Sequence, residues 1–181
     1  TVLILIALTM FFAYMFVDVL SPLKSMLEKT AEEGGLGWSS TVFGTYGSSE
    51  FFLNVFFFFL IFAGIILDKM GVRFTAVLSG ALMVLGALIK VYALSTTFNN
   101  GGFGFELFNS FMPSMPPSAK LACVGFMIFG CGCEMGGVTV SRAIVKWFEG
   151  KEMALAMGLE MAVARLGVFA VFRVSAPIAE H

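Results

Sequence analysis

The chain has 181 residues, of which 59% are hydrophobic and 13% are charged, and its net charge is −1. An ordinary soluble domain has about 45–50% apolar and about 25% charged residues, so the composition indicates a membrane protein. The weak net charge and the lack of a basic stripe argue against nucleic acid as a partner. We therefore predict an all-α polytopic bundle that has the lipid bilayer as its environment.

Five stretches are apolar and long enough to cross a bilayer, whose core of about 30 Å needs roughly 20 residues per helix. Four ranges lack charge altogether, namely 1–17, 51–67, 74–89 and 121–133. The fifth stretch is apolar overall but contains Glu160, Arg165 and Arg173. With their polar ends included, the predicted spans lie near 1–21, 41–67, 74–96, 119–143 and 152–175.

The distribution of basic residues predicts the orientation, because cytoplasmic connections between spans are enriched in Lys and Arg. These residues concentrate in the connections 68–73 and 142–151, whereas the connection 95–118 contains a single charged residue, Glu106. We therefore predict that the N-terminus and the two basic connections are cytoplasmic and that 95–118 is external. The chain starts with Thr1 inside an apolar run, so we expect it to be a fragment of a longer protein.

The segment GIILDKMGVR, residues 64–73, follows the second predicted span directly. In physical terms it is a hairpin, in which Gly71 supplies a turn and the charged side chains lie in water. The spacing is more specific than a turn requires, however. Gly64 would let another helix approach closely, and the carboxylate of Asp68 could accept backbone N–H groups or bind a cation of a neighbouring span.

This segment resembles the signature of the loop between spans two and three in the major facilitator superfamily. The matching residues are Gly64, Asp68, Lys69, Gly71 and Arg73. The resemblance implies a twelve-helix fold of two bundles, of which this chain would form about five helices of the N-terminal half. It also implies that the motif is a conformational latch between the two halves, in which Asp68 is not a substrate ligand.

A second resemblance indicates a branch of that superfamily. Residues 146–167 resemble the connection between spans four and five in the lysosomal dipeptide uniporters, called major facilitator superfamily domain-containing protein one in animals. Residues 129–137 are similar to the fourth span of that branch, and residues 14–18 are similar, more weakly, to its first span. One departure is Phe126, which stands where many members of the superfamily have an arginine.

Charged residues at bilayer depth are functional candidates, because by some scales each costs about 2.5–3.5 kcal/mol. Glu134 precedes Arg142 by eight residues and Arg165 follows Glu152 by thirteen, so both candidates fall in the middle third of the membrane. A guanidinium and a carboxylate can bind the two ends of a zwitterion. Arg165 would bind the carboxylate and Glu134 the amine, and the dipeptide branch has its key charges at matching positions. The alternative is an ion pair that only fastens two helices.

Three further residues are weaker candidates. Glu160 lies about 140° around the helix from Arg165, so the two cannot share a face. It is either a protonatable coupling group or a polar contact to another helix. Asp18 is a surface cap or a cavity ligand, and Asn54 lines the cavity or bonds to a neighbouring helix.

No nucleophile with its base, phosphate loop or metal cluster is recognisable, so we predict neither catalysis nor a cofactor nor a bound metal. The three cysteines are interpreted as small packing residues, and the one histidine is His181. The leading hypothesis is a carrier that moves small zwitterionic solutes such as dipeptides by alternating access. Its expected partners are the solute, the bilayer and the C-terminal half. The alternatives are a proton-coupled carrier of organic anions or drugs, and a facilitator-fold receptor that binds without transport.

Overall fold

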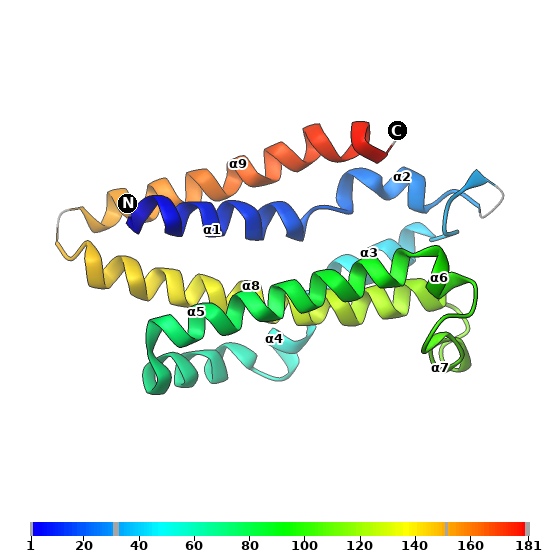
Figure 1. Cartoon of the computed structure of the whole chain (residues 1–181), viewed down its shortest axis with the longest axis horizontal. Coiled ribbons are helices and arrows are strands. Elements are labelled where there is room, and N and C mark those ends of the chain that lie inside the picture. Colours follow the sequence, from blue (N-terminus) through cyan, green and yellow to red (C-terminus); the bar gives the residue numbers. More distant parts are fainter. Residues whose placement is uncertain (1, 31–32, 151, 180–181) are drawn as a thin grey trace. The chain divides into compact units, whose positions relative to one another are not determined.

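The computed structural model describes residues 2–30, 33–150 and 152–179. Predictions that involve Thr1, Lys151 and His181 therefore fall outside the described residues. The prediction of an all-α fold is confirmed, since the described residues contain helices and no strand. The elements are α1 (Val2–Val17), η1 (Ser21–Leu23), α2 (Lys24–Leu27), α3 (Ser40–Ser49), α4 (Phe52–Phe56), α5 (Phe59–Leu94), α6 (Thr96–Asn99), α7 (Phe105–Ser110), α8 (Pro117–Trp147) and α9 (Met153–Ala179) (Figure 1).

Within the described residues, four helical stretches are long and apolar enough to cross a membrane: Val2–Leu27, Phe59–Leu94, Pro117–Trp147 and Met153–Ser175. The sequence predicts about five, and the difference arises at Gly71. This residue has φ +82° and ψ +169°, which is not helical, so α5 consists of two helical segments joined by a kink at Gly71. Only glycine adopts such a conformation without strain, so Gly71 separates two helical segments within α5 (Figure 1).

The region 41–67 is not one regular helix. The helix α3 ends at Ser49, and α4 is only five residues long. Phe58 then has φ +50° immediately before α5 begins. A left-handed conformation costs an L-residue about 1–2 kcal/mol, so this phenylalanine interrupts the helical path between α4 and α5.

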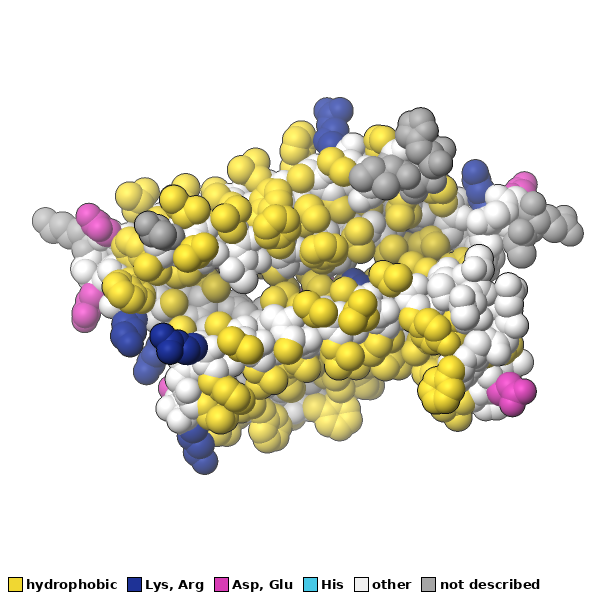
Figure 2. All heavy atoms as spheres, viewed as in Figure 1, with side chains coloured by type: hydrophobic (Ala, Val, Ile, Leu, Met, Phe, Trp, Pro, Cys, Tyr) yellow, Lys and Arg dark blue, Asp and Glu magenta, His cyan; other side chains and the backbone are white. Residues whose placement is uncertain are grey.

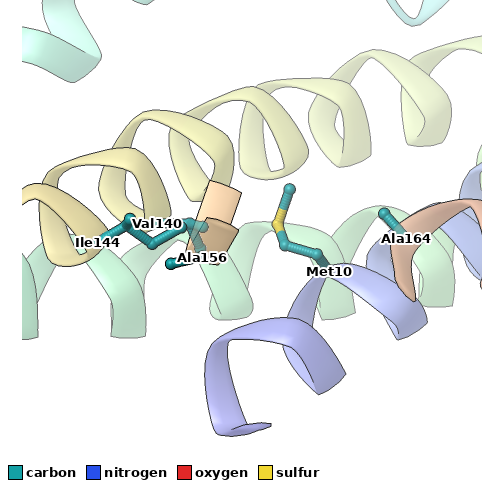
Figure 3. Close-up of a cluster of buried hydrophobic side chains, with 5 residues drawn as sticks. All are labelled: Met10, Val140, Ile144, Ala156 and Ala164. Atoms are coloured by element: carbon teal, nitrogen blue, oxygen red, sulfur yellow. The ribbon is translucent and has the colours of Figure 1, made fainter. Parts of the chain in front are cut away.

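The chain forms two compact units, and the first contains residues within 1–23, 60–80 and 132–181. Its core joins three helices, with Met10 from α1, Val140 and Ile144 from α8, and Ala156 and Ala164 from α9 (Figure 3). The helix α1 packs along α9.

Two small residues bring helices of this first unit close together. At Gly167 on α9, a Cβ would lie 2.2 Å from the carbonyl oxygen of Phe11 on α1. Ser79 on α5 donates a hydrogen bond of 2.7 Å to the carbonyl oxygen of Gly132 on α8. Close backbone approach and polar contacts of this kind are typical of helix packing in membranes.

The second unit contains described residues within 24–59 and 81–131. Its buried Trp38 donates a hydrogen bond of 3.1 Å from Nε1 to the hydroxyl of Ser118. Close packing of α5 on α8 depends on glycine, because a Cβ at Gly86 would lie 2.5 Å from the carbonyl oxygen of Gly125. The aromatic ring of Tyr46 stacks on that of Phe126 with 4.6 Å between centroids.

Both units bury some polar side chains and expose many large apolar ones, in contrast to a typical soluble protein. On α5, for example, Thr75 and Ser79 are buried, whereas Val77 and Val91 are about 70% and 68% exposed. Apolar side chains cover most of the visible surface (Figure 2). This pattern is expected when the outer faces of the helices contact lipid and polar groups face the protein interior.

Candidate functional site

Tyr14 on α1 interacts with several of the charged residues that were predicted as candidates in the first unit. The guanidinium carbon of Arg165 on α9 lies 5.9 Å from the centroid of the Tyr14 ring. Three other groups interact electrostatically with Tyr14, namely Cys133 and Glu134 on α8 and Glu160 on α9. Three helices thus contribute polar groups of both signs to one place.

Glu134 and Arg165 belong to the same unit and do not pair with each other. Within the described part of the chain, no ion pair involves either side chain. Arg165 is exposed and Glu134 is partly buried. The helix-fastening ion pair that was the alternative interpretation is therefore not formed within the described residues.

The three weaker candidates, Glu160, Asp18 and Asn54, lie in different environments. Glu160 is buried whereas Arg165 on the same helix is exposed, as expected for residues on different faces. Asp18 follows the end of α1 and accepts a hydrogen bond of 3.2 Å from the hydroxyl of Ser21, which is a local capping contact. Asn54 belongs to the second unit and is buried.

The loop motif of residues 64–73 forms an ion pair within the first unit. The carboxylate of Asp68 lies 3.8 Å from the guanidinium of Arg142 at the end of α8, and the two side chains are 70% and 62% exposed. They line a cavity of about 830 Å³ together with Gly71 and Arg73, among others. Lys69 is exposed.

The close helix approach expected at Gly64 is not seen in the described part of the chain. A Cβ added to Gly64 would meet no atom within 4 Å. Glycine at this position is therefore not required by the contacts that this chain makes.

The second unit buries three charged residues that escaped the sequence analysis. Lys120 lies near the start of α8 and is 5% exposed, and the other two are Glu50 and Lys90, which are 7% and 4% exposed. The ammonium of Lys90 lies 4.6 Å from the ring centroid of Phe126 and 4.4 Å from that of Phe129. A cation from α5 thus lies beside Phe126. Glu50 and Lys90 fall inside predicted spans, so the criterion of charge at bilayer depth would have found them.

Tyr14 also escaped, although it lies in the segment 14–18 that resembles the first span of the dipeptide branch. An aromatic residue in an apolar span has no distinctive sequence signal, because such residues usually pack against lipid or other helices. Only the proximity of Arg165 distinguishes it.

Comparison with known proteins decides the family. The sequence matches the Major Facilitator Superfamily over residues 6–179. The chain belongs to this superfamily. As a facilitator it is an integral multi-pass membrane protein of a transporter family, which agrees with the motif at residues 64–73.

The facilitator is similar to several curated relatives. It is 31% identical over 107 residues to the lysosomal dipeptide transporter MFSD1 of Bos taurus, an alignment that covers 59% of this chain and 19% of the relative. It is 32% identical over 115 residues to MFSD1 of Danio rerio, covering 63% and 20%, and 46% identical over 44 residues to that of Gallus gallus, covering 24% and 10%. The alignments thus span a fifth or less of these relatives, and no solved structure matches the chain significantly.

Proposed function

We propose that this chain is the N-terminal part of a carrier that moves small zwitterionic solutes, such as dipeptides, by alternating access. The observation that carries the proposal is the arrangement around Tyr14, because the guanidinium of Arg165 lies 5.9 Å from its ring and the carboxylate of Glu134, on another helix, interacts electrostatically with the same residue. A solute with one carboxylate and one ammonium matches these two charges. The names of the relatives support dipeptides as the solute class.

Each group has a definite role in this proposal. The planar guanidinium of Arg165 presents parallel N–H donors that can bind the solute carboxylate in a bidentate manner. The Tyr14 ring at 5.9 Å holds that guanidinium by a cation–π interaction of about 0.5–2 kcal/mol. Glu134 accepts hydrogen bonds from the solute ammonium.

The complete carrier would include a C-terminal half, because facilitators alternate by rocking one bundle against the other. The connections 68–73 and 142–151 would lie on the cytoplasmic side. There the latch motif, with Asp68 positioned by its partner Arg142, would contact the other half and brace the two halves in one state of the cycle.

Uptake by the complete transporter in liposomes tests this function. Labelled dipeptides and single amino acids are compared with and without an inward proton gradient. We expect dipeptide flux that is indifferent to the gradient and weak flux of single amino acids. Flux that follows the gradient would instead favour a proton-coupled carrier, and saturable binding without flux would favour a receptor.

The Asp68–Arg142 pair gives a prediction that separates a latch from a stabilising contact. Because both side chains are more than half exposed, the pair contributes only about 0–1 kcal/mol to stability. We expect Asp68→Asn to leave the thermal unfolding temperature nearly unchanged but to lower the uptake rate severalfold. Glu149→Gln, which alters an exposed carboxylate lining the same cavity, should change neither quantity. Equal uptake by the two variants would contradict the latch.

A further inference from the structure

The second unit contains buried charges of both signs against one turn of α8. Gly130 on this turn faces Glu50 directly, since a Cβ there would lie 2.8 Å from Glu50 Cγ and 2.4 Å from its carbonyl oxygen. The ammonium of Lys90 lies over Phe126 and Phe129 of the same turn. Glu50, between α3 and α4, and Lys90, on α5, therefore both contact the five-residue stretch 126–130 of α8.

Asn54 adds an unsatisfied polar group to the same unit. Its side chain is 9% exposed, and neither Nδ2 nor Oδ1 has a hydrogen-bond partner. A buried amide without partners is destabilising, because it has lost its hydrogen bonds to water without replacing them, so its presence calls for an explanation.

Glu50 and Asn54 lie on the same face of their segment. Glu50 has helical φ and ψ of −52° and −42°, and Phe51 also has a right-handed helical conformation, so the path from α3 into α4 is nearly helical. Residues four apart are then neighbours on one side of the helix. Exposure agrees with this, because Glu50 and Asn54 are buried whereas Phe52 and Val55 are exposed.

The free donor and the free acceptor of Asn54 match a protonated carboxyl. A carboxylate only accepts hydrogen bonds, whereas a carboxylic acid offers one O–H donor and one carbonyl acceptor. Protonated Glu50 could donate its O–H to Asn54 Oδ1 and accept from Nδ2. The ionised form can satisfy at most the Nδ2 group.

Lys90 has a partner that does not depend on the charge of Glu50. Two aromatic rings, whose centroids lie 4.6 Å and 4.4 Å away, stabilise its ammonium by cation–π attraction. Uptake of one proton by Glu50 raises the charge of the Glu50–Lys90 cluster from zero to +1, and the rings of Phe126 and Phe129 can hold that charge.

We propose that Glu50 is a proton-binding site of this facilitator and that Asn54 is the hydrogen-bond partner of its protonated form. The ligand is a proton taken from water, and no solute is required. The other buried titratable side chains of the unit are Tyr46 on α3, Lys90 on α5, and Lys120, Cys123 and Cys131 on α8. Phenols, thiols and ammonium groups ordinarily titrate above about pH 8, so a carboxyl is the group expected to gain a proton between about pH 8 and pH 5.

Infrared difference spectra of the complete purified transporter, recorded between these two pH values without solute, test the proposal. We expect a carbonyl-stretch band of a protonated carboxylic acid that disappears in Glu50→Gln. The same band should remain in Asn54→Leu but move to higher frequency, because the carbonyl loses its hydrogen bond. Asn100→Leu, which removes an exposed amide, is the matched control and should leave the band in place.

A spectrum that Glu50→Gln leaves unchanged would overturn the proposal. If that variant does not fold, the Asn54→Leu spectrum decides, and an unshifted band overturns it. Glu160→Gln shows whether the buried carboxyl of the first unit contributes separately, and the wild-type band lost in Glu50→Gln should persist in it. Because no solute is present, failure here is independent of failure in the uptake assay.

Discussion

Replacing Arg165 by Ala is expected to lower dipeptide uptake by the complete transporter by roughly 30-fold or more. Truncating one member of a hydrogen-bonded charge pair in a desolvated site costs about 2–5 kcal/mol, and about 1.4 kcal/mol corresponds to a factor of ten. Arg165→Lys should give an intermediate rate, since it keeps the charge but loses the bidentate geometry. Initial uptake rates over a range of dipeptide concentrations measure the effect.

Arg173→Ala provides the matched control for this prediction. Arg173 is an exposed arginine on the same helix, and its guanidinium carbon lies 5.7 Å from the ring of Phe169. It has no contact with Tyr14, so uptake should stay near the wild-type rate. Thermal stabilisation by added dipeptide should also be lost only in Arg165→Ala. Wild-type uptake in Arg165→Ala, or an equal loss in both variants, would remove Arg165 from the site.

Replacing Gly167 by Ala is expected to destabilise the first unit by about 1–3 kcal/mol. The added Cβ would lie 2.2 Å from the carbonyl oxygen of Phe11, a backbone atom that cannot rotate away. The helix α1 would have to move away from α9, which would also displace Tyr14 relative to Arg165. Thermal unfolding of the purified transporter measures the loss, and reduced uptake should accompany it.

Gly158→Ala tests whether the effect comes from the contact or from the loss of glycine. Gly158 lies on the same helix, but a Cβ there would meet no atom within 4 Å. Alanine favours helix by about 1 kcal/mol over glycine, so this variant should be as stable as the wild type or more stable. Destabilisation of similar size in both variants would show that the approach of Phe11 is not the cause.

Hydropathy was sufficient to predict an all-α membrane protein, because satisfying the backbone in lipid permits few other structures. The motif at residues 64–73 was sufficient to indicate the superfamily, since its residues are close in the chain. The interruption at Phe58 could not be predicted in the same way. It is a local backbone conformation inside a continuous apolar run, where composition does not change.

The candidate site was only partly predictable. Glu134 and Arg165 stand out as charges within apolar spans, and counting residues from the ends of the helices is enough to estimate their depth. Tyr14 does not stand out, because its relevance depends on the guanidinium of Arg165, which is about 150 residues away in sequence but 5.9 Å away in space.

The sequence by itself determined the membrane environment, the helical class, the superfamily and the presence of charges within apolar spans, because these depend on composition and on short-range spacing. Only the tertiary structure decided which polar groups meet. Within the described residues, Glu134 and Arg165 do not form an ion pair with each other, whereas Arg142 lies beside Asp68. The buried amide of Asn54 has no hydrogen-bond partner. The physical reason is that hydrogen bonds and ion pairs form between helices, and whether a buried group is satisfied depends on residues far away in the chain.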